Sequence, residues 1–216
     1  MKNHHANSLR RHIALALMLC TLMATSRAAH AQRGGASWLL QYDGKSTNDL
    51  IWNKRFRSFL NSHLQPASYK FWGDTQQDLS QAASQFLGGP PDNIRVIDSR
   101  YVIASACVAH DCPERGLLWV DTKTSAVVFA PSTWIKDSGF GDKERYHLWL
   151  FANPAIDPAQ LPPSLLNGIE QWSAQVNGDG KSHSTISTVT LVSPDGKTTQ
   201  LTPAAVHAWQ PLAQQQ

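Results

Sequence analysis

Residues 94–130 read IRVIDSRYVIASACVAHDCPERGLLWVDTKTSAVVFA, and this stretch decides the expected fold. Apolar runs suited to strands recur along it at 94–97, 101–107, 116–121 and 126–130. Asp98-Ser99 lies between the first two runs and Thr122–Ser125 between the last two, and both segments are rich in turn-forming residues. Short apolar runs separated in this way are typical of strands joined as hairpins, which pair antiparallel. The stretch therefore predicts the centre of an antiparallel sheet.

Two amphipathic segments precede this sheet. Ser46, Thr47 and Asn48 can cap a helix that begins near Asp49 and ends before Pro66. Its expected apolar face has helical spacing and consists of Trp52, Phe56, Phe59, Leu60 and His63. A second helix is expected over residues 76–87, because the same spacing recurs at Leu79, Ala82, Ala83, Phe86 and Leu87. The run Gly88-Gly89-Pro90-Pro91 should stop it.

The remaining third of the chain extends this pattern. A fifth strand is expected at 146–152, then a proline-rich connector at 153–163 and a short helix at 164–175. Strands at 185–192 and 198–202 flank the turn sequence Ser193–Lys197, and the final Gln214-Gln215-Gln216 should be frayed. The predicted fold class is α+β, because helices precede a run of strands. It comprises an antiparallel β-sheet of about five strands with flanking helices, plus a C-terminal β-hairpin that extends the sheet or packs on it.

The N-terminus has the three parts of a secretory signal. A polar, basic segment at 1–12 precedes the apolar run IALALMLCTLM at 13–23, and Ala29-His30-Ala31 offers small residues where signal peptidase cuts. Cleavage is expected before Gln32, which would place the protein in the periplasm. A retained membrane anchor is the alternative, although the run is short for a span. A lipoprotein site at Cys20 is disfavoured because the large Leu19 precedes it.

Removal of residues 1–31 changes the charge of the chain. The segment carries four of the 19 Lys and Arg residues and none of the 16 Asp and Glu residues. The 185 remaining residues therefore hold 15 basic and 16 acidic groups, a formal net charge of −1. Nucleic acid is not an expected partner, because no basic footprint for phosphates remains. No membrane contact is expected after cleavage.

Cleavage also leaves an even pair of cysteines, Cys107 and Cys112. In an exported protein such a pair favours a disulfide. The loop is short, so the bridge should stabilise the fold by only about 2 kcal/mol, but it would fix the shape of the four residues inside it. Metal binding is an alternative, although the loop offers only three ligands, Cys107, His110 and Cys112. A redox role is a weaker reading, since four residues and not two separate the cysteines. A catalytic dyad of His110 with Asp111 is also weaker, since the chain has no Gly-x-Ser-x-Gly motif.

Residues 101–112, YVIASACVAHDC, followed by GLLWVD at 116–121, resemble the bacterial inhibitors of vertebrate lysozyme, the Ivy family. The family signature is a Cys-x-x-His-Asp-Cys loop after an apolar strand, and here it reads Cys107-Val108-Ala109-His110-Asp111-Cys112. The resemblance covers roughly residues 44–131. It implies an inhibitor domain at 32–152, with the connector, helix and hairpin of 153–216 packed on the same domain.

The resemblance also implies a mode of action. The loop, comprising Cys107, Val108, Ala109, His110, Asp111 and Cys112, would enter the active-site cleft of a lysozyme, with a c-type lysozyme as the expected partner. The imidazole of His110 would hydrogen-bond the two catalytic carboxyl groups, and Asp111 would be the second contact. Val108-Ala109 replace a typical Lys-Pro pair, which affects the choice of lysozyme. No enzymatic activity, cofactor or metal is expected, and a homodimer is compatible with the family.

Two other functions use the same loop. An envelope protein that restrains the cell's own lytic transglycosylases would present the same protruding loop. An enzyme of unknown reaction would instead show turnover and a cleft lined by several titratable groups. Inhibition assays on a panel of lysozymes and lytic transglycosylases distinguish an inhibitor of lysozyme from a protein that restrains the cell's own transglycosylases.

Overall fold

The strands of the central sheet carry buried side chains at successive positions, which shows that both faces of the sheet are covered. The computed structural model describes residues 35–136, 144–175 and 184–209, so the expected signal peptide (1–31) and the C-terminal glutamines lie outside the described residues. In the second strand of the sheet, Val102 and Ala104 belong to one hydrophobic cluster and Ile103 to another. Since successive side chains of a strand point to opposite faces, the sheet separates two cores.

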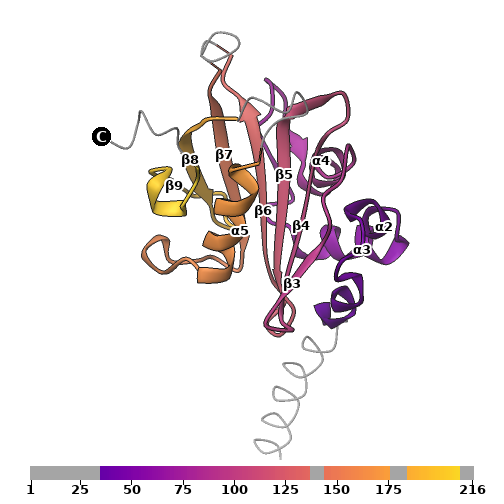
Figure 1. Cartoon of the computed structure of the whole chain (residues 1–216). Coiled ribbons are helices and arrows are strands. Elements are labelled where there is room, and N and C mark those ends of the chain that lie inside the picture. Colours follow the sequence, from indigo (N-terminus) through magenta and orange to yellow (C-terminus); the bar gives the residue numbers. More distant parts are fainter. Residues whose placement is uncertain (1–34, 137–143, 176–183, 210–216) are drawn as a thin grey trace, which may run out of the picture. The chain divides into compact units, whose positions relative to one another are not determined.

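Seven strands form this sheet, in the same order as in the chain (Figure 1). They are β3 (Arg95–Ile97), β4 (Tyr101–Val108), β5 (Asp111–Asp121), β6 (Ala126–Trp134), β7 (Tyr146–Asn153), β8 (Ile186–Val192) and β9 (Thr198–Leu201). All neighbours pair antiparallel except β7 and β8, which are parallel. A separate hairpin pairs β1 (Ser68–Tyr69) with β2 (Gln77–Asp78).

The α+β class is confirmed, and the C-terminal hairpin extends the sheet, which was one of its two expected positions, but the prediction of a wholly antiparallel sheet was wrong. The five predicted strands are β3 to β7, and the C-terminal hairpin adds β8 and β9 to the same sheet. The helix α5 (Pro163–Ser173) connects β7 to β8. A crossover of this kind brings the chain back in the same direction, so β8 runs parallel to β7 and the sheet is mixed.

Helices cover the sheet on both sides (Figure 1). The cluster on one face includes residues of η1 (Ala36–Tyr42), α2 (Thr47–Ile51), α3 (Lys54–His63) and α4 (Leu79–Phe86). The cluster on the other face includes residues of α5 and of the short η4 (Ala204–Val206), while η3 (Pro158–Gln160) lies in the proline-rich connector. Within the described part of the chain, no helix has the length and apolar character needed to cross a membrane.

The single helix predicted from Asp49 to Pro66 is divided into α2 and α3. Ser46 caps α2 as expected, and Asn53 caps α3 by accepting a 2.8 Å hydrogen bond from the Arg55 amide. Phe56, Phe59 and Leu60 are buried as predicted, whereas Trp52 precedes the new cap and is 81% exposed. The break turns Trp52 away from the apolar face to which its spacing assigned it.

The second predicted helix begins later than expected. Gln77 and Asp78 pair with Tyr69 and Ser68 across the small hairpin, so the chain is extended at these positions. Asp78 then caps α4, accepting a 2.8 Å hydrogen bond from the Gln81 amide. The helix therefore starts at Leu79 and not at residue 76.

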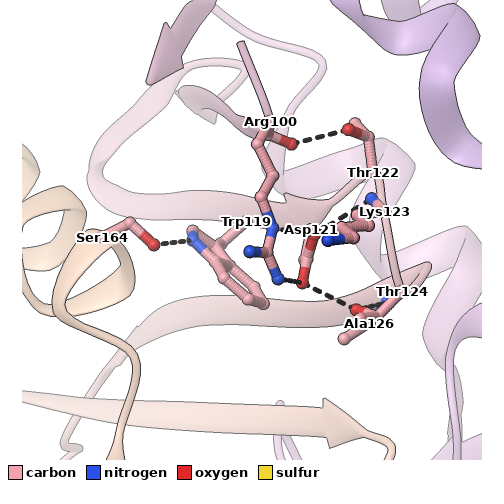
Figure 2. A network of polar contacts seen from close by, with 8 residues as sticks. All are labelled: Arg100, Trp119, Asp121, Thr122, Lys123, Thr124, Ala126 and Ser164. Atoms are coloured by element: carbon pink, nitrogen blue, oxygen red, sulfur yellow. Dashed lines mark hydrogen bonds and ion pairs between the residues drawn. The ribbon is translucent and has the colours of Figure 1, made fainter. Parts of the chain in front are cut away.

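The two predicted turns of the central hairpins are confirmed and meet in one polar network (Figure 2). Arg100 donates two hydrogen bonds to the Asp121 carboxylate, of 2.8 Å from Nε and 2.6 Å from Nη2. The same carboxylate accepts bonds from the Lys123 amide and the Thr124 hydroxyl. The Arg100 guanidinium, above all, holds the pKa of Asp121 well below its usual range. One buried carboxylate thus joins the β3–β4 turn to the β5–β6 turn.

Asp121→Asn should lower the melting temperature by about 5 °C near pH 7, because it removes a charge-assisted bidentate contact. Since folding depresses the pKa of Asp121, this stabilisation is present above the unfolded-state value near 4 and is lost as the pH falls below it. Thermal melts from pH 7 to pH 2.5 should therefore show the difference between parent and variant shrinking in acid. A difference that grows in acid would contradict the assigned role.

Candidate functional site

The cysteine loop lies at the end of the sheet opposite the Arg100–Asp121 network. Strand β4 ends at Val108 and β5 begins at Asp111, earlier than the predicted Gly116, so only Ala109 and His110 form the turn. The register shifts here: Val108 pairs with Asp111, while Cys107 pairs with Arg115. Residues 112–114 therefore have no partner on β4, and this bulge redirects the side chains beside the loop.

The predicted disulfide between Cys107 and Cys112 is confirmed, with 4.7 Å between the Cα atoms. A second support comes from the segment before β3, which runs beside the base of the loop. The Gly89 amide donates a 2.9 Å hydrogen bond to the Cys107 carbonyl, and the Cys107 amide donates to the Pro90 carbonyl at 3.3 Å. A Cβ atom on Gly89 would lie 2.3 Å from that Cys107 oxygen, so the close approach requires glycine.

The tip of the loop is open to solvent. Ala109, His110 and Asp111 are exposed, while Cys107 is buried and Cys112 is half-buried. His110 has φ of 66°, a left-handed conformation that is uncommon for residues other than glycine. Within the described residues, no hydrogen bond or ion pair holds the His110 ring. The loop joins β4 and β5, which are inner strands of the sheet, so its tip projects from the end of the sheet.

An acidic pocket of about 390 Å³ lies on one side of the loop. It is lined by Trp72, Asp111, Pro113, Glu114, Trp134, Glu144 and Tyr146. Strand β5 supplies Asp111 and Glu114 through the bulge, and Trp134 and Tyr146 come from the facing ends of β6 and β7. Three carboxyl groups and three aromatic rings thus share one small space.

The pKa values of two of these carboxyl groups are raised. Burial raises the pKa of Glu114 most, although the Trp134 backbone amide, which donates to Glu114 Oε1 at 2.9 Å, opposes the shift. Asp111 is exposed as a whole residue, but partial desolvation of its carboxyl group beside the pocket raises its pKa, and the negative charge of Glu144 adds to the effect. The Tyr146 hydroxyl donates a 2.8 Å hydrogen bond to Glu144 Oε2, and its own pKa is raised by burial first and by this contact second. The pocket therefore favours a cationic or hydrogen-bond-donating occupant.

A second hollow, a groove of about 650 Å³, also borders the loop, and Val108 and Ala109 form part of its wall. Trp72 lines both the groove and the acidic pocket, with its ring packed edge-on against Phe86 at 4.8 Å between centroids. The loop residues are thus divided between two hollows: Val108 and Ala109 face the groove, and Asp111 faces the carboxyl groups.

No family model, curated protein or solved structure matches this chain. The likeness to lysozyme inhibitors therefore rests on the loop residues and the strands around them. Across the residues that the structure describes, no group of three or more His, Cys, Asp or Glu side chains is arranged to hold a metal ion.

Several residues around the loop escaped the sequence reasoning. Trp72, Glu114 and the neighbouring pair of Glu144 and Tyr146 come from three separate segments, and no spacing in the chain connects these segments. Of these residues, only Glu114 could have been placed near the loop from the sequence, because it lies two residues after Cys112. Trp52 was assigned to the core and instead lines the groove.

Glu144→Gln should bring the pKa of Asp111 closer to its ordinary value, because the repulsion between the two carboxylates disappears. The shift should be partial, since burial is the larger cause and remains. Carboxyl ¹³C titration by NMR measures it directly. The same titration should show the pKa of Asp195, far from the pocket and held low by Lys197, unchanged. An unaltered Asp111 pKa would mean that the two carboxylates do not interact.

Proposed function

We propose that this chain is a periplasmic inhibitor of lysozyme that inserts the loop Cys107–Cys112 into the active-site cleft of its target. The observation that carries the proposal is the exposed His110 at the tip of a disulfide-closed turn, with no partner for its ring among the described residues. The Cys-x-x-His-Asp-Cys spacing shared with known inhibitors supports it.

The chemistry of the cleft accounts for a histidine at the tip. Lysozymes cleave their glycan with two carboxyl groups that face each other across a deep cleft. An imidazole has two ring nitrogens, and each can hydrogen-bond one carboxyl group. A hydrogen bond between charged groups contributes about 1.5–3 kcal/mol. His110 can make both bonds without first breaking a bond within its own fold.

The rigidity of the loop base lowers the cost of binding. The disulfide holds the two ends of the loop, and the Gly89–Pro90 segment holds the Cys107 backbone through two hydrogen bonds. A loop held in its binding conformation loses less entropy when it enters a cleft. The loop also extends from a paired hairpin whose strands are buried on both faces, so its direction is set by the sheet.

Asp111 has a different part from that of His110. It lines the acidic pocket with Glu114 and Glu144, so its carboxylate adds to a negative patch beside the tip. Such a patch steers a partner with positive charge around its cleft and raises the association rate at low ionic strength. Asp111 therefore helps to orient the approaching lysozyme, while His110 occupies its cleft.

The acidic pocket is also the observation that favours an enzyme as the alternative. A hollow with several titratable carboxyl groups is what an active site of unknown reaction would present. Incubating the protein with labelled peptidoglycan separates the two, because an inhibitor releases no fragments. A panel that includes lytic transglycosylases separates an inhibitor of lysozyme from an envelope protein that restrains the cell's own enzymes.

His110→Ala should weaken inhibition of the responsive lysozyme by about thirtyfold, as truncation of a central contact costs about 2 kcal/mol. Asp111→Ala should cost less and should act mainly at low salt. His207→Ala is the matched control, because His207 is also an exposed histidine with positive φ, of 57°, but lies in another part of the fold. Residual lysozyme activity is measured against inhibitor concentration. Full inhibition by His110→Ala would remove the loop from the mechanism.

Replacing both Cys107 and Cys112 by Ser should weaken inhibition while lowering the melting temperature only slightly. The closed loop is short, so its bridge contributes about 2 kcal/mol or less to folding. Backbone hydrogen bonds from Gly89 and to Pro90 would still hold one end of the loop. Inhibition curves beside thermal melts test this. A collapse of the fold would assign the bridge a structural role.

A further inference from the structure

The groove beside the loop has an exposed tryptophan at its lip. Trp52 is 81% exposed, and it is the sole large apolar side chain that the fold leaves exposed in the described ranges. Its position follows from the break between α2 and α3, which leaves it just before the Asn53 cap. Phe56 and Trp72 continue the apolar lining inward. A large apolar ring held in water at the mouth of a groove marks a binding surface.

The electrostatics of the groove favour an anion. Lys54 and Arg57 line it, and they lie three residues apart on α3, so they share one face of that helix. Neither Asp nor Glu is among the described residues that line the groove, and no ion pair occupies Lys54 or Arg57 within the described part of the chain. The N-terminal end of α3, at the Asn53 cap, adds partial positive charge at the same place.

Arg57 also borders a neighbouring cavity that includes Asp78. The Asp78 carboxylate already accepts hydrogen bonds from the Ser80 hydroxyl at 2.7 Å and from the Gln81 amide at 2.8 Å. These contacts hold Asp78 at the cap of α4, and among the described residues no ion pair joins it to Arg57. The guanidinium of Arg57 is therefore available to a ligand in the groove.

The uncharged polar groups narrow the ligand class further. Asn53, Ser84 and Gln85 line the groove among the apolar residues. The Asn53 side chain already accepts from the Arg55 amide and donates to the Tyr42 hydroxyl, and the Ser84 hydroxyl donates to the Ser80 carbonyl. Among the described residues, Gln85 is therefore the polar side chain of the groove that an apolar acid such as a fatty acid would cover without giving it a partner. A sugar ring has one face of C–H bonds that can stack on an indole, and hydroxyl and acetamido groups at its edge. The volume of about 650 Å³ fits an oligosaccharide better than the broad contact area of a protein interface.

We infer that the Trp52 groove binds a carboxylate-bearing amino-sugar chain, the chemistry of a glycan that contains muramic acid. One sugar ring stacks on the Trp52 indole, the Gln85 side chain hydrogen-bonds an acetamido group, and the carboxylate contacts Lys54 and Arg57. This site goes beyond the proposed function: it recognises the glycan that a lysozyme cleaves and not the lysozyme. The groove would then hold the inhibitor on the polymer close to the enzymes that attack it.

The test is direct titration of the purified full chain with the disaccharide of N-acetylglucosamine and N-acetylmuramic acid. Calorimetry gives the affinity, and the NMR signal of the Trp52 indole N–H reports the place of binding. Di-N-acetylchitobiose is the neutral comparison and octanoate is the apolar anion. The acidic disaccharide should bind about tenfold more tightly than chitobiose, since only the former offers a carboxylate to Arg57.

Variants of the groove separate its two contributions. Trp52→Ala should weaken both sugars by about tenfold or more, and Arg57→Gln should abolish the preference for the acidic one. Arg55→Gln is the matched control, because Arg55 lies on the same helix but packs over the Trp38 ring at 4.8 Å and does not line the groove. It should bind both sugars like the parent.

Three results would overturn the inference: no binding of the acidic disaccharide, equal or tighter binding of octanoate, or binding that Trp52→Ala leaves unchanged. Thermal melts of each variant show that the fold is intact, and the exposed positions of Trp52 and Arg57 make loss of folding unexpected. No lysozyme is present in this titration, so its failure would leave the inhibition proposal untouched. Conversely, loss of inhibition in His110→Ala says nothing about the groove.

Discussion

Burial of the central sheet on both faces is the constraint on which the rest of the structure depends. Strands β4 to β7 contribute alternate side chains to two separate cores, so every residue of their central segments is committed to one core or the other. A slip of one residue in register would exchange the two sets of side chains between the cores. The ends of the strands are therefore fixed in space. The turns that connect these ends are fixed with them.

The two ends of the sheet carry different kinds of polar groups. At one end, the Arg100–Asp121 contact joins two hairpin turns and satisfies a buried carboxylate (Figure 2). At the other end, the β4–β5 turn carries His110 into solvent, and the register shift after Cys107 places Asp111 and Glu114 beside it.

The surroundings of the loop combine opposite chemistries within a short distance. Carboxyl groups line the acidic pocket, Lys54 and Arg57 line the Trp52 groove, and Trp72 lines both hollows. A partner that approaches the loop therefore meets a negatively charged patch and a positively charged patch at defined positions. This arrangement favours a specific orientation of docking over nonspecific attraction.

The sequence by itself determined the α+β class, the five strands from β3 to β7, the Cys107–Cys112 bridge and the exposed tip, because each depends on spacing within a short segment. Only the tertiary structure decided that β8 runs parallel to β7, that Asn53 interrupts the first helix and exposes Trp52, and that Glu114, Glu144 and Tyr146 meet beside the loop. These features depend on contacts between segments far apart in the chain. Periodicity records which face of a segment is apolar, and it carries no record of which distant segment covers that face.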